Sequence, residues 1–390
     1  MLGLTQRSVL ALALSVTGGA WAWGDTAADP AAPSRRAAEL VRQLGSSSFA
    51  DREQASRELV KMGMVARDSL AAGLRDSDAE IRFRSREIFS VIRDADLKAR
   101  IEAFAADVDG HKNLSLPGWN YFRTRLGSGR LPRVLFVEMA RAEPALLETL
   151  DAGDFKEAGE LLTTRCQAVN EMVQSQNTRV RQQISTGSVA TFLLVASSPG
   201  VAIEEQLGYQ LNGFIYQSGF QLAVRDGATS PQYKKLLTDW VVKDSGNNIG
   251  YYNLMLALNF ELPEGLEVAL RLLHAGGEVQ MRQYAILAVG RYGKPEHVSV
   301  IEPLLADSAV CLKQQVNNRE IQVQIRDVAL AVLVRMTGQD LKEYGFENVQ
   351  THQQMLYNPG SLNFADAAKR EVALKKWREY AAAKSGKKAA

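Results

Sequence analysis

Side chains that commonly hold metals or carry out acid–base chemistry are sparse in this chain. It has four histidines and two cysteines: His111, His274, His297, His352, Cys166 and Cys311. No two histidines are four residues apart and none neighbours a cysteine, so the spacing of a zinc site is absent. The G-x-S-x-G, Walker A and G-x-G-x-x-G motifs are absent too. We expect no metal, no cofactor and no catalysis, although an active site assembled from distant residues stays open as an alternative.

One short segment begins like a calcium-binding loop. Asp107 and Asp109 stand where the first two ligands of an EF-hand would lie. Such a loop then needs an oxygen ligand at its fifth position, glycine at its sixth and glutamate at its twelfth. This chain has His111, Lys112 and Gly118 there. The segment therefore predicts a turn and not a metal site.

Residues 1–22 have the pattern of an export signal. Arg7 precedes a short apolar run at 8–16, and Ala20 and Ala22 form a small-x-small cleavage site. The run is short for a membrane span, which needs ~20 residues. We expect cleavage after Ala22 and a periplasmic, envelope or secreted location, with an uncleaved membrane anchor as the alternative. Residues 23–33 are rich in alanine and proline and are typical of a linker.

Export implies an oxidising compartment, yet Cys166 and Cys311 are the only cysteines. They are 145 residues apart in sequence. Because we expect an extended array of helices, we predict two separate thiols that pack as small apolar side chains.

Residues 34–105 show helical periodicity with clear start and stop signals. Ser48 is placed to cap a helix that Gly63 ends. Asp78 is placed to cap another helix, whose apolar side carries Ile81, Ile88 and Ile92. The arginines of that helix predict an ion-paired, solvated face, with a basic groove for an anionic partner as the alternative.

Residues 106–230 form a middle block that departs from the spacing of the rest, so whether it continues the same array stays open. Trp119, Tyr121 and Phe122 predict packing at a junction between helical blocks, or else an exposed recognition patch. The run 189–196 is wholly apolar and predicts a central buried helix. Ser185 and Ser198 have no neighbouring motif that would mark a catalytic serine, and we expect them to act only as helix caps.

Residues 231–340 contain an internal match at a spacing of 44 residues. Residues 278–286 lie over 322–330, and the matching pairs are Val279/Val323, Gln280/Gln324, Arg282/Arg326 and Ala285/Ala329. A period in the forties with a helix in each copy is typical of HEAT and armadillo repeats. The polar residues 314–319 predict a loop or helix end between the copies. Residues 341–390 predict an irregular capping segment and a basic closing helix over 365–383.

Residues 36–93 and 231–338 resemble HEAT-repeat proteins. Three stretches, 44–63, 116–147 and 321–350, also resemble a group of uncharacterised secreted bacterial HEAT-repeat proteins. The resemblance implies an all-α, armadillo-type α-solenoid with no assigned activity. It transfers no functional residues.

We therefore expect an interaction or scaffold protein that binds a protein or peptide. The candidate face residues are Gln280, Arg282, Gln283, Gln324 and Asp327. Arg282 and Arg326 are alternatively ion pairs between repeats. Nucleic acid is not expected, because the net charge is +2 and no long basic stripe with interleaved aromatics is present.

Two other functions remain as alternatives. One is an enzyme or small-ligand protein with a pocket between the middle block and the C-terminal repeats, walled by Trp119, His274 and Tyr284. The other is weak contact of the C-terminal helix with an anionic surface, since that helix and its tail carry eight Lys or Arg and two Glu from Lys369 onward.

Overall fold

The computed structural model describes residues 31–175, 183–243, 246–316 and 319–388. The expected signal peptide and most of the linker lie outside these ranges. Within them the chain is mostly helical, which confirms the all-α expectation. No helix in the described ranges is long and apolar enough to cross a membrane. The chain divides into two compact units, the first ending at Leu97 and the second beginning at Lys98.

The first unit is built from α1 (Ala32–Gln43), α2 (Phe49–Met62), η1 (Gly63–Ala66), α3 (Arg67–Gly73) and the beginning of α4 (Ala79–Ala106). Ser48 caps α2 by accepting a hydrogen bond from the Asp51 amide, and Gly63 ends that helix, as expected. Asp78 accepts from the Glu80 amide at 2.8 Å at the start of α4. These local bonds explain why helix boundaries in this unit follow the sequence closely.

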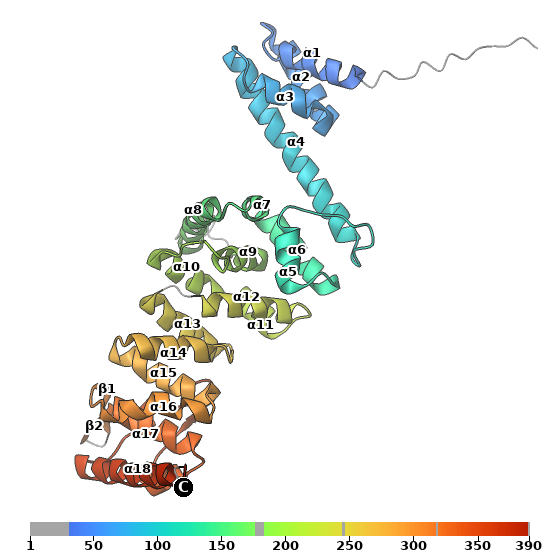
Figure 1. Ribbon diagram of the computed structural model, residues 1–390. Helices are drawn as coiled ribbons and strands as arrows, with labels where there is room; N and C mark the ends of the chain where they lie inside the picture. The colour runs from blue at the N-terminus through green and yellow to red at the C-terminus, as the bar shows by residue number, and fades with distance from the viewer. Residues whose placement is uncertain (1–30, 176–182, 244–245, 317–318, 389–390) are drawn as a thin grey trace, which may run out of the picture. The chain divides into compact units, whose positions relative to one another are not determined.

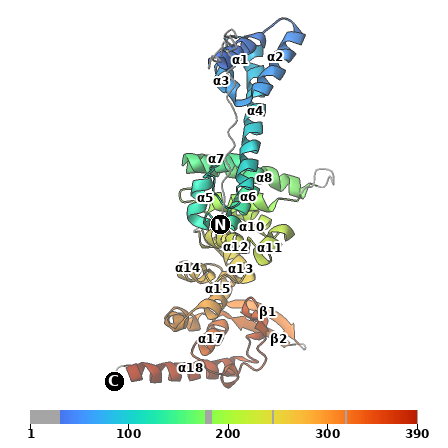
Figure 2. The ribbon, with the colours of Figure 1, turned by 90° about the vertical axis from the view of Figure 1, so that its right-hand side faces the viewer.

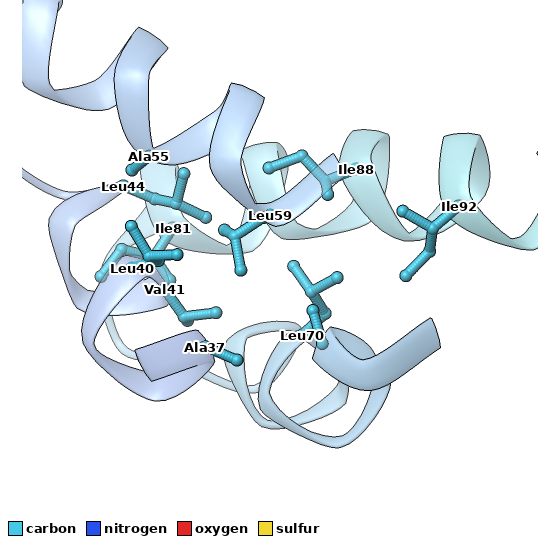
Figure 3. Packing of buried hydrophobic residues seen from close by; sticks show 11 residues of the cluster. Ala37, Leu40, Val41, Leu44, Ala55, Leu59, Leu70, Ile81, Ile88 and Ile92 are labelled. Atoms are coloured by element: carbon cyan, nitrogen blue, oxygen red, sulfur yellow. The ribbon is translucent and has the colours of Figure 1, made fainter. Parts of the chain in front are cut away.

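The core of the first unit gathers aliphatic side chains from all of its α-helices (Figure 3). Ile81, Ile88 and Ile92 are buried on one side of α4, as their spacing predicts. On the polar side, Arg84 pairs with Glu53 at 2.8 Å and with Glu80 at 2.6 Å. The arginines of α4 therefore form part of an ion-paired face.

The second unit begins with the end of α4. Its next helices are α5 (Trp119–Leu126), α6 (Arg130–Ala142), α7 (Pro144–Ala152), α8 (Phe155–Gln174), α9 (Thr186–Ala196), α10 (Glu205–Ile215) and α11 (Ser218–Arg225). Asp154 caps α8 by accepting from the Glu157 amide at 2.9 Å. Every residue of α9 from Gly187 to Ala196 is buried, which confirms the central buried helix expected at 189–196.

The unit continues through α12 (Ser230–Val242), α13 (Asn247–Asn259), α14 (Gly265–Ala275), α15 (Val279–Tyr292), η2 (Pro295–His297), α16 (Val298–Ile301), η3 (Glu302–Ala306), α17 (Ile325–Met336) and α18 (Ala367–Lys388). These helices follow one another in chain order along the unit (Figures 1 and 2). α12 packs on α9, and α14 packs on α12. α13 packs on α10, α15 on α13 and α17 on α15. The helices α10, α13, α15 and α17 are called the α10–α17 series.

A β-hairpin precedes α17, and it corrects the sequence interpretation of this region. Strand β1 (Val310–Val316) pairs antiparallel with β2 (Arg319–Gln324). The sequence predicts a loop or helix end at 314–319 and a helix that already includes 322–324. The helix instead begins at Ile325, because the Asp327 carboxylate accepts the Gln324 amide hydrogen bond at 2.9 Å and ends the strand there.

After α17 the chain forms η4 (Leu341–Tyr344), β3 (Thr351–His352), β4 (Leu356–Tyr357) and η5 (Pro359–Ser361) before α18. This segment buries four aromatic side chains: Tyr344, Phe346, Tyr357 and Phe364. β4 packs on α15, and η4 packs on α17 and α18. The segment thus covers the C-terminal helices with its aromatic residues.

A candidate interaction surface

The five predicted face residues divide into exposed, ion-paired and buried positions. Gln280 is exposed and Gln324 is half-buried. Gln283 is 3% exposed and Asp327 is 1% exposed. The expectation that Gln283 and Asp327 lie on an exposed face is therefore wrong. Both sit on the side of their helix that packs against neighbouring elements.

Asp327 is held by a residue far away in sequence. Arg370 of α18 donates to its two carboxylate oxygens at 2.7 and 3.1 Å. Burial raises the pKa of Asp327, and the Arg370 guanidinium and the Gln324 amide act against that rise. This carboxylate therefore links α17 to α18 through a buried ion pair.

The two repeat-matched arginines both form ion pairs. Arg282 lies 3.1 Å from Asp307, and Arg326 lies 3.3 Å from Glu371. Both side chains are about one-fifth exposed, at 19% and 22%. This agrees with the alternative in which they join neighbouring elements.

Trp119, His274 and Tyr284 do not form a common pocket wall. Trp119 is buried in α5 against the rings of Phe104, Phe122 and Phe136. His274 is exposed on α14, and Tyr284 is half-buried on α15. These three residues do not line the cavities beside Arg133, Lys243, Trp377 and Arg165. Trp119 belongs to the interior, which agrees with the expectation that the aromatics near it pack between helices.

Tyr284 instead ends a continuous line of tyrosines along the α10–α17 series. The ring of Tyr209 on α10 lies 5.2 Å from Tyr252 on α13. Tyr252 lies 5.5 Å from Tyr251, which lies 6.0 Å from Tyr284 on α15. Tyr252 is 45% exposed and Tyr209 is 36% exposed. These four residues are called the tyrosine row.

Each of the three helices also carries a polar residue four positions before a row tyrosine. These residues are Glu205 before Tyr209, Asn248 before Tyr252 and Gln280 before Tyr284. Residues four apart lie on one face of a helix. All three polar side chains are exposed. The result is a surface on which aromatic rings alternate with hydrogen-bonding groups.

Hydrogen bonds tie the first two helices of this surface together. Glu205 accepts from the Tyr209 hydroxyl and, at 3.0 Å, from the Asn248 amide. The bond to Glu205 raises the pKa of Tyr209 to about 12 and lowers the pKa of the carboxyl. The hydroxyl therefore stays protonated, and the carboxylate stays charged at neutral pH.

A buried polar network fixes α10 and α13 beneath the row. Asn212 donates to Asn253 at 3.3 Å and accepts from the Trp240 indole at 2.8 Å. Asn253 donates to the Trp240 carbonyl at 3.2 Å. Because Asn253 directly follows Tyr252 in α13, this network sets which residues of the two helices face each other. Tyr209, Tyr251 and Tyr252 were not predicted as surface residues, although each stands four positions after a polar residue.

The structure also locates the segment that begins like a calcium-binding loop, the two cysteines and the basic C-terminal helix. Asp107 accepts from the amides of His111 and Lys112, which makes the segment a turn as predicted. No metal-binding group of His, Cys, Asp and Glu occurs among the described residues. Both cysteines are free thiols. Several basic residues of α18 are ion-paired, including Lys369 with Glu347 and Lys376 with Glu343.

In comparisons with known proteins, no family model, no curated protein and no solved structure matches this chain.

Proposed function

We propose that this chain is an exported HEAT-type α-solenoid that serves as a protein-interaction or scaffold module, with no catalytic activity. The observation that carries the proposal is the tyrosine row with its polar partners on α10, α13 and α15, of which α13 packs on both others. Tyrosine is enriched at protein interfaces, because it contributes a large apolar ring and a hydroxyl at low entropic cost.

Two features support the repeat interpretation. From α12 onward, helices pack on their second neighbour in the chain, α14 on α12 and α15 on α13, as stacked helix pairs do. The 44-residue match joins α15 with β2 and the start of α17, and these two helices pack on each other. The two copies differ where they begin. Val323 and Gln324 belong to strand β2, whereas the matching Val279 and Gln280 begin helix α15. We interpret this as a local variation at one repeat junction.

The chemistry of the row favours an extended segment that carries Lys or Arg. Tyrosine faces attract cations, and the Glu205 carboxylate adds a negative charge beside them. Asn248 and Gln280 carry amides that both donate and accept, as a peptide backbone requires. The partner that fits is a protein segment with basic residues spaced among apolar ones.

The test uses the full chain and labelled peptides in a fluorescence anisotropy titration. One peptide set alternates Lys or Arg with Val or Pro, and the other replaces every basic residue with Glu. We expect binding of the basic set only. Tyr252→Ala should weaken it at least about tenfold, or about 1.4 kcal/mol, because exposed aromatics dominate such interfaces.

Tyr380→Ala, on α18 and outside the row, is the matched control and should bind like the parent. Equal affinity of the Tyr252→Ala and Tyr380→Ala proteins, or stronger binding of the acidic peptides, would refute the proposed surface. The export part is tested separately: the mature protein recovered from cells should begin at Trp23. A chain that retains residues 1–22 and sediments with membranes would support the anchor instead.

A further inference from the structure

A cavity of about 590 Å³ lies where α5, the segment after α9, and α12 meet. It carries three cationic side chains, Arg125, Lys235 and Lys243, and one carboxylate, Asp239. The formal charge of its lining is therefore +2. It is separate from the tyrosine row, whose residues do not line it.

Arg125 is positioned by an aromatic ring. Its guanidinium lies 4.2 Å from the centre of the Tyr121 ring, a cation–π arrangement that leaves the edges of the fork open to hydrogen bonding. The Tyr121 hydroxyl donates to Ser198 Oγ at 2.6 Å, which fixes the ring. Among the described residues, no carboxylate pairs with Arg125.

Lys243 is held by backbone carbonyls of the segment after α9. Its ammonium donates to the carbonyls of Ser198 at 2.9 Å and Val201 at 2.7 Å. Burial lowers the pKa of Lys243, and the nearby Arg125 charge lowers it further. Arg125 and Lys243 thus contribute their charges to one partly buried site.

The hydroxyls of the cavity cannot serve as the main donors. Thr124 donates to the Tyr121 carbonyl, Ser197 to the Leu193 carbonyl and Ser198 to the Leu194 carbonyl. Donors for a ligand must therefore come from the cationic side chains. Asp239 pairs with Lys235 along α12 and offsets part of that lysine's charge.

We propose that this cavity binds the phosphate group of a small phosphate monoester. A dianionic phosphate matches the +2 lining, and its oxygens suit the planar fork of Arg125. The volume exceeds that of inorganic phosphate and leaves room for a small organic group. The same chemistry is present in the headgroup of phosphatidic acid, so the experiment separates the two sources.

The experiment is calorimetric titration of the full chain with glycerol 3-phosphate, with glycerol as the neutral control and phosphatidylcholine vesicles with or without phosphatidic acid as a further arm. We expect saturable binding of glycerol 3-phosphate and none of glycerol. Binding to phosphatidic acid vesicles without binding to glycerol 3-phosphate would overturn the small-molecule assignment.

Four variants make the test specific. Arg125→Ala should weaken binding at least about tenfold, because it removes a charged bidentate donor. Lys235→Ala should weaken it several-fold, while Lys234→Ala, the adjacent exposed lysine outside the cavity, should leave it unchanged. Asp239→Asn should tighten binding several-fold, because it removes the only carboxylate of the lining.

Weaker binding by Asp239→Asn, or equal losses in Lys234→Ala and Lys235→Ala, would refute the site. Absence of glycerol 3-phosphate binding at millimolar concentration would refute it as well. Circular dichroism shows whether Arg125→Ala folds. If it does not, the affinities of the Lys234→Ala and Lys235→Ala variants for glycerol 3-phosphate still test the site, because both lysines are exposed.

Discussion

Asp327 and Arg370 form a buried ion pair whose partners come from α17 and α18. Their side chains are 1% and 8% exposed. Each oxygen of the carboxylate receives a hydrogen bond from the guanidinium, and one also accepts the Gln324 amide. Removal of either partner leaves a buried charge without compensation.

We predict that Arg370→Ala lowers the free energy of unfolding by about 3–5 kcal/mol. Lys375→Ala is the control, since its pair with Glu379 is exposed and should contribute less than about 1 kcal/mol. Urea denaturation followed by circular dichroism measures both. A loss below about 1 kcal/mol in Arg370→Ala would contradict the role given to this pair.

The two thiols are protected by burial. Burial raises the pKa of Cys166 above its usual range, and it raises the pKa of Cys311 to about 12. Because the thiolate is the reactive form, both cysteines should react slowly with iodoacetamide in the folded protein at pH 8.5. The same protein unfolded in guanidinium should be labelled rapidly at both positions, as mass spectrometry would detect.

The raised thiol pKa values also predict a pH dependence. A group whose folded pKa exceeds its unfolded value contributes stability in full below the unfolded pKa, about 8.5 for cysteine. That contribution is lost as pH rises toward about 12 for Cys311. Cys311→Ser should therefore reduce the loss of stability between pH 8 and 10. An unchanged pH profile would show that this thiol does not titrate differently on unfolding.

At the scale of elements, close approach of α6 and α9 depends on one glycine. A Cβ added at Gly187 would lie 2.5 Å from the carbonyl oxygen of Glu138 and 2.8 Å from its carbonyl carbon. Both are backbone atoms, which cannot move away without shifting α6. α9 is buried along nearly its whole length, so it has little room to adjust.

We predict that Gly187→Ala destabilises the protein by about 1–3 kcal/mol, the usual cost of overpacking. Gly213→Ala in α10 is the matched control, because nothing lies within 4 Å of its added Cβ. There the change should stabilise by about 0.5–1 kcal/mol through helix propensity. Thermal unfolding of the two variants should shift in opposite directions, and a shared direction would contradict the contact between α6 and α9.

At the scale of the second unit, stability should be graded along the chain. α9 and the stretch Val328–Val334 of α17 are buried almost completely, while residues 381–384 of α18 are mostly exposed. In stacked repeats each helix pair contacts only its neighbours, so the ends open before the interior.

We therefore predict that hydrogen exchange is slowest in α9 and α17 and fastest in the C-terminal turns of α18. Peptide-resolved mass spectrometry of the full chain measures this order. Uniform protection across α9 to α18 would instead indicate one cooperative core, and would argue against the proposed solenoid.

Local features of the fold were predictable from the sequence. Ser48 and Asp78 cap helices where the sequence places them, because a cap depends only on the next two or three residues. The buried character of α9 followed from its unbroken apolar run. Strands β1 and β2 were not predicted, because residues 322–330 match residues 278–286, most of which lie in helix α15.

Tertiary structure decided the candidate site. The buried Asp327 carboxylate is paired with Arg370, which is 43 residues away in sequence. No local sequence pattern predicts such an ion pair. The tyrosine row needs α10, α13 and α15 in register, which the Asn212–Asn253–Trp240 network sets for the first two helices. The sequence by itself determined helical content and many helix boundaries, because those depend on neighbours in the chain. Only packing decided which side chains share a surface, because that depends on contacts between residues distant in sequence.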